Sequence, residues 1–139
     1  MSVFLYDRDK EYSYDMLIES INQRREYCPL FKSKDIFAYF ENLLKAIVTD
    51  SPLVLMDSDL NVSELASVDE SQVNVAVQLP CYHFDDIDAV IAALKKSSSE
   101  ITVFTSGTTG QPKKVVHTMD TLTRAVRLGD KYNGQVWAY

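Results

Sequence analysis

Apolar residues near the N-terminus recur at the spacing of an amphipathic helix. They occupy positions i, i+3, i+4 and i+7 and are Tyr14, Leu17, Ile18 and Ile21. Ser13 stands directly before them, and serine is a favoured N-cap residue because its hydroxyl accepts from a free backbone N–H. The pattern predicts a short helix that begins after Ser13.

A second, broader apolar stripe over residues 36–48 predicts a longer helix. Ser33 is placed to cap its start, and Pro52 ends it because proline cannot donate a backbone hydrogen bond. The segment PLVLM at 52–56 predicts a short strand. The polar, acidic stretch at 57–72 predicts an exposed loop with one helical turn.

From residue 73 the pattern alternates between the strand period of two and the helix period of 3.6. The predicted elements are a strand over 73–79, a helix over 87–94, strands over 101–104 and 114–118, a helix over 119–126 and a strand over 135–139. Such alternation predicts an α/β layered fold, with helices on a largely parallel sheet and right-handed crossovers. We expect a single domain over 1–139. Residues 1–72 should be mainly helical with one short strand, and residues 73–139 should alternate between strands and helices.

Composition and net charge limit the classes of partner that the chain can bind. With 139 residues, 46% of them hydrophobic and 24% charged, the chain has the make-up of one soluble globular domain. A net charge of −6 argues against a nucleic-acid partner, because phosphate backbones favour clustered lysine and arginine. No apolar run approaches the roughly 20 residues that span a bilayer. The two cysteines, Cys28 and Cys81, lack the spacing of a disulfide framework or zinc site, so we expect a reducing, cytoplasmic location.

Small hydroxyl residues and glycines interrupt the apolar segments in ITVFTSGTTGQPKKVVHT, residues 101–118. Gly107 and Gly110 allow backbone N–H groups to converge on an anion. The neighbouring side chains that supply hydroxyl donors are Thr105, Ser106, Thr108 and Thr109. Lys113 adds a positive charge, and Pro112 stiffens the approach to it. These residues predict a phosphate-binding loop, but not a Walker A loop, whose second glycine and lysine stand at different spacings.

The same string resembles the signature of the adenylate-forming superfamily, which includes acyl-CoA synthetases, nonribosomal-peptide adenylation domains and luciferases. The family form is roughly [YF]-T-S-G-[ST]-T-G-x-P-K-G-V. The matching positions are Phe104, Thr105, Ser106, Gly107, Thr108, Thr109, Gly110, Pro112, Lys113 and Val115. A glycine- and threonine-rich hairpin turn would not need this lysine, proline and hydroxyl pattern together.

The resemblance implies a ligase that activates a small-molecule carboxylic acid with ATP, giving an acyl-adenylate and pyrophosphate. The acyl group is then usually transferred to the thiol of CoA or of carrier-protein pantetheine. In the family this loop holds the β- and γ-phosphates. Carried over, the hydroxyls and the glycine backbone would bind phosphate oxygens, and Lys113 would help to neutralise the leaving pyrophosphate.

Two positions depart from the family pattern. Lys114 replaces the glycine that usually follows the lysine, and either adds charge to the phosphate site or begins a strand and faces solvent. Met119 stands where a histidine often follows the loop. The departures indicate a divergent acyl-activating branch, so the acid and the thiol acceptor stay open.

The resemblance is specific only over 104–118, and complete family members are several times longer. The Mg²⁺-binding glutamate and the catalytic lysine of the family are therefore expected outside this chain, which would carry no catalytic residue and no metal ligand of its own. We expect an N-terminal fragment, inactive alone, whose apolar end VWAY invites self-association. The alternative is a stand-alone, non-catalytic module that binds nucleotide or a partner.

Other conspicuous polar residues have simpler readings. Cys81 and His83 lack further ligands for a metal. His117 lies just after the loop and either contacts the phosphate site or, as we expect, is a core histidine. An acidic group stands at the start of the predicted helix over 87–94 and consists of Asp85, Asp86 and Asp88. This position explains the carboxylates through the helix dipole, without a metal.

Overall fold

A computed structural model describes residues 2–106, 110–126 and 130–132. The helices are α1 (Tyr14–Gln23), α2 (Ile36–Val48), α3 (Ile87–Lys96) and α4 (Met119–Thr123). The strands are β1 (Val3–Asp7), β2 (Lys10–Ser13), β3 (Glu26–Tyr27), β4 (Leu30–Lys32), β5 (Leu53–Met56), β6 (Val77–Gln78), β7 (Ile101–Thr105) and β8 (Lys113–His117). Three 3₁₀ turns complete the described elements: η1 (Val62–Glu64), η2 (Glu70–Gln72) and η3 (Asp130–Tyr132).

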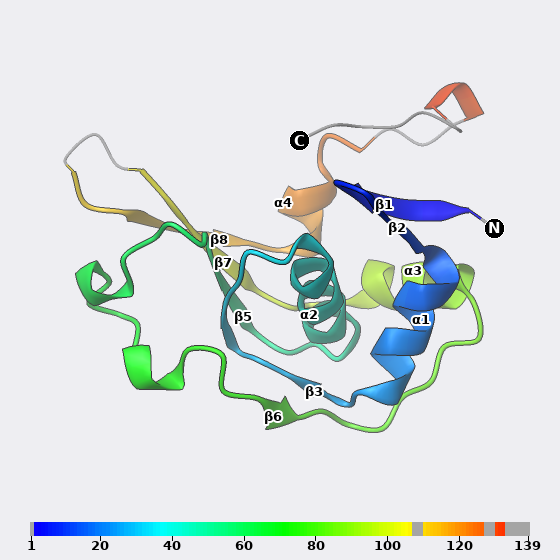
Figure 1. The fold of residues 1–139 in the computed structure, drawn as a ribbon, viewed down its shortest axis with the longest axis horizontal. Coiled ribbons are helices and arrows are strands. Elements are labelled where there is room, and N and C mark those ends of the chain that lie inside the picture. The colour runs from blue at the N-terminus through cyan, green and yellow to red at the C-terminus, as the bar shows by residue number, and fades with distance from the viewer. Residues whose placement is uncertain (1, 107–109, 127–129, 133–139) are drawn as a thin grey trace.

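The main sheet has four strands in the order β4-β5-β7-β8. The β4–β5 and β5–β7 pairs are parallel, whereas β8 runs antiparallel to β7. Two further antiparallel pairs, β1–β2 and β3–β6, form separate small sheets (Figure 1). The predicted α/β class is therefore confirmed as a mixed fold with a partly parallel sheet.

Strand β5 divides the core between the two faces of the main sheet, because successive side chains of a strand point in opposite directions. Leu53 packs with Ala46 and Ile47 of α2 and with Ile101 of β7. Met56 belongs to the second cluster, which includes two residues from the segment that follows β5, Val62 and Leu65. In Figure 1 this segment runs past the sheet on the side away from α1, α2 and α3. Helices therefore cover one face, and an extended segment covers the other.

Helix starts follow the expected capping chemistry, with one change of residue. The Ser13 hydroxyl accepts from Met16 N at 3.1 Å, which confirms the predicted start of α1. Helix α2 is capped by Asp35, whose carboxylate accepts from Ala38 N at 3.0 Å. The prediction of Ser33 as the cap was wrong, because α2 begins at Ile36 and Asp35 stands directly before it. Ser33 instead accepts from Asp35 N at 3.0 Å and supports the cap.

Two sequence predictions between 57 and 79 need correction. The segment 57–72 is not wholly exposed, because Val62 and Leu65 are buried against the sheet. The predicted strand over 73–79 is reduced to β6, which pairs with β3. Asn74 interrupts it, because its φ of 60° is left-handed and lies outside the extended conformation of a regular strand.

The remaining elements agree in part with the pattern. The strands predicted over 101–104 and 114–118 correspond to β7 and β8. Helix α4 ends at Thr123, short of the predicted 126. The predicted strand over 135–139 lies outside the described residues. Within the part of the chain that the structure describes, no helix has the length and apolar character needed to cross a membrane.

Candidate functional site

The predicted phosphate loop lies between β7 and β8, which form an antiparallel hairpin (Figure 1). Thr105, the last residue of β7, pairs with Lys113, the first residue of β8. The Thr105 hydroxyl lies 3.5 Å from the Lys113 carbonyl oxygen, at the long end of hydrogen-bond distances. Ser106 follows Thr105, and all three side chains are exposed. The hairpin therefore brings two predicted ligand residues from opposite sides of the loop to its base.

Gly110 has φ 80, a backbone conformation that favours glycine. A Cβ placed on Gly110 would meet no atom within 4 Å, so the glycine is explained by its backbone angle and not by crowding. Three other predicted site residues, Gly107, Thr108 and Thr109, lie outside the described residues. The structure thus places Thr105, Ser106, Gly110 and Lys113 of the predicted set.

A pocket of about 680 Å³ adjoins the hairpin at the carboxyl ends of β4, β5 and β7. Its wall is mostly apolar and its rim polar, and its residues are Ser33, Lys34, Ile36, Tyr39, Phe40, Leu43, Leu55, Met56, Asp57, Ser58, Val103 and Phe104. Phe104 directly precedes Thr105, so the pocket and the loop meet at the end of β7. Ligands of open α/β sheets characteristically bind outside the carboxyl ends of the strands.

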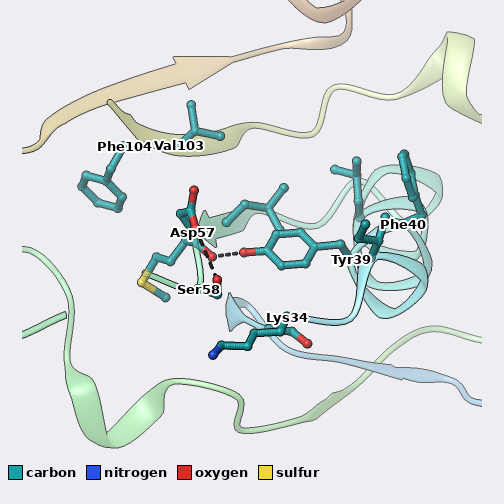
Figure 2. A pocket seen from close by; sticks show the side chains of 12 residues that line it. Lys34, Tyr39, Phe40, Asp57, Ser58, Val103 and Phe104 are labelled. Carbon is teal, nitrogen blue, oxygen red and sulfur yellow. Dashed lines mark hydrogen bonds between the residues drawn. The ribbon is translucent and has the colours of Figure 1, made fainter. Parts of the chain in front are cut away.

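Tyr39 links the α2 wall of the pocket to β5. Its hydroxyl donates to the Met56 carbonyl oxygen, as the dashed line in Figure 2 marks. Burial raises the pKa of Tyr39, and the nearby Asp57 carboxylate raises it further. The phenol therefore stays protonated at neutral pH and holds this side of the pocket in place.

The other candidates from the sequence do not gather into a second site. Arg25 Nη1 donates to the Cys81 sulfur at 2.6 Å, whereas His83 lies 3.4 Å from the Asp85 carboxylate, with both partners exposed. Among the described residues, no group of three or more histidine, cysteine, aspartate or glutamate side chains is placed to hold a metal ion. The Asp86 carboxylate accepts from Ala89 N at 2.8 Å and caps α3.

Residues beyond the loop have mainly structural contacts. Lys114 pairs with Phe104 in the β7–β8 ladder and its side chain is exposed, as expected if it faces solvent. His117 Nδ1 lies 3.3 Å from the Thr121 hydroxyl at the start of α4. Met119 packs against the core cluster on the α2 face of the sheet.

The sequence pattern did not single out the two charged residues of the pocket rim. Lys34 follows β4, a strand of three residues that carries no clear periodicity. Asp57 directly follows the predicted strand β5, and a polar residue at the end of a buried strand is the signal that could have identified it. Both line one pocket because β4 and β5 pair in parallel, a pairing that the sequence did not predict.

Comparisons with protein families, with curated proteins and with solved structures find no match to this chain.

Proposed function

We propose that this chain is the phosphate-binding part of an ATP-dependent carboxylic acid–AMP ligase. The observation that carries the proposal is the hairpin register, which sets the Thr105 hydroxyl and the Lys113 ammonium on the two strands that flank one loop. The signature over 104–115 supplies the hydroxyl, glycine and lysine groups that would bind phosphate in that loop. Phosphate groups fit the exposed hydroxyls of Thr105 and Ser106 and the open space at Gly110.

The described residues would act on ATP by positioning and by charge. Hydroxyls of Thr105 and Ser106 and the backbone near Gly110 would hold the terminal phosphates, together with Gly107, Thr108 and Thr109. In the reaction a carboxylate oxygen forms a bond to the α-phosphorus, while the bond from that phosphorus to pyrophosphate breaks. Lys113 would stabilise the negative charge that develops on the leaving pyrophosphate. Mg²⁺ would accompany ATP, and CoA or carrier-protein pantetheine would accept the acyl group.

The proposed function is tested by ATP–pyrophosphate exchange with a panel of carboxylic acids, using the full reading frame that contains this chain. Lys113→Ala should lower the exchange rate about 100-fold, the size of effect seen when one stabilising donor is lost from a transition state. Lys10→Ala, which removes an exposed lysine from β2, is the matched control and should leave the rate unchanged. An equal rate for Lys113→Ala and the control contradicts the loop assignment.

Mg-ATP binding and exchange, measured together on the full reading frame, separate the two functional alternatives. If the full reading frame binds Mg-ATP through Lys113 but supports no exchange with any acid, the ligase is excluded in favour of a non-catalytic nucleotide-binding module. If exchange occurs, the chain belongs to an enzyme.

A further inference from the structure

We draw no further inference here: the strongest candidate, the exposed apolar surface of Val116 on β8, at the edge of the main sheet, and of Leu122 and Val126 in and after α4, carries no proposal, because nothing among the described residues shows what covers it.

Discussion

At the scale of single residues, three asparagine side chains act as substitutes for a piece of strand backbone. Each carboxamide donates to the carbonyl and accepts from the N–H of one residue far away in the sequence. The pairs are Asn22 with Phe84, Asn42 with Cys28, and Asn74 with Lys32, at distances between 2.8 and 3.0 Å. These contacts satisfy backbone groups that no neighbouring strand reaches, which is the usual requirement for polar groups inside a protein.

Asn42 is the most consequential of the three, because it is 6% exposed. Asn42→Ala should lower the free energy of unfolding by about 2–3 kcal/mol, since it leaves the N–H and carbonyl of Cys28 without their partner. Urea denaturation followed by circular dichroism measures this change.

Asn74→Gly is the matched control, because Asn74 makes the same two bonds at an exposed position. Glycine keeps the left-handed backbone at this residue, φ 60, without strain. Water can replace the lost bonds, so the cost should stay near 1 kcal/mol or below. Equal costs for the two variants would show that burial does not set the value of the Asn42 contacts.

At the scale of elements, helix α3 shows how a single side chain fixes a boundary. Asp86 accepts from Ala89 N and caps the helix, whereas Asp88 lies in the first turn without that bond. Asp86→Ala should therefore lower the free energy of unfolding by about 1 kcal/mol. Asp88→Ala removes only a favourable interaction with the helix dipole and should cost about 0.3 kcal/mol. Thermal unfolding of both variants tests the difference, and an equal loss would contradict the capping role.

The elements that the sequence predicted are those with a strong local signal. Helices α1 and α3 have clear apolar periodicity and a capping residue directly before them. Strand β5 is an uninterrupted apolar run, and β7 is apolar at Ile101, Val103 and Phe104. The hairpin base of the candidate site follows from the loop signature, because Thr105 and Lys113 stand at its two ends.

The missed elements depend on distant partners. Strands β3 and β4 have two and three residues, and each becomes a strand only by pairing with a segment far along the chain. The antiparallel β1–β2 pair was also missed, because β1 is largely apolar but β2, its partner, is polar outside Tyr12 and gives no strand pattern. The pocket rim was missed for the same reason, because Lys34 and Asp57 line one pocket only after β4 and β5 pair.

At the scale of the whole molecule, three tyrosine hydroxyls join separate segments by donating to backbone carbonyls. Tyr27 donates to Pro52 at 3.0 Å, Tyr82 donates to Ile21 at 2.8 Å, and Tyr39 donates to Met56. Burial is the main cause that raises the pKa of each phenol, for Tyr82 to about 12. The folded chain therefore holds these protons more tightly than the unfolded chain does.

This difference predicts a loss of stability at alkaline pH. The stabilisation from Tyr82 is fully present below pH 10, where the unfolded phenol is protonated, and is lost as the pH rises towards 12. Tyr82→Phe should flatten this part of the stability–pH curve by about 1–2 kcal/mol, allowing for partial exposure. Tyr6→Phe, at a side chain that is 52% exposed, is the control and should keep the wild-type slope. Denaturant midpoints measured from pH 8 to 12 test this prediction. Equal slopes of stability against pH for the two variants would contradict the role of Tyr82.

The antiparallel hairpin also has a consequence for the order in which the molecule folds. Thr105 and Lys113 are 8 residues apart, whereas the contact of Ser99 with Ser51, beside the β5–β7 pairing, joins residues 48 apart. Closing the longer loop costs about 1.6 kcal/mol more in chain entropy. Local contacts of this kind form early and long-range parallel pairing forms late. The hairpin that carries the loop is thus the part of the sheet that can form first. Its two strands can pair before the pocket beside it is assembled.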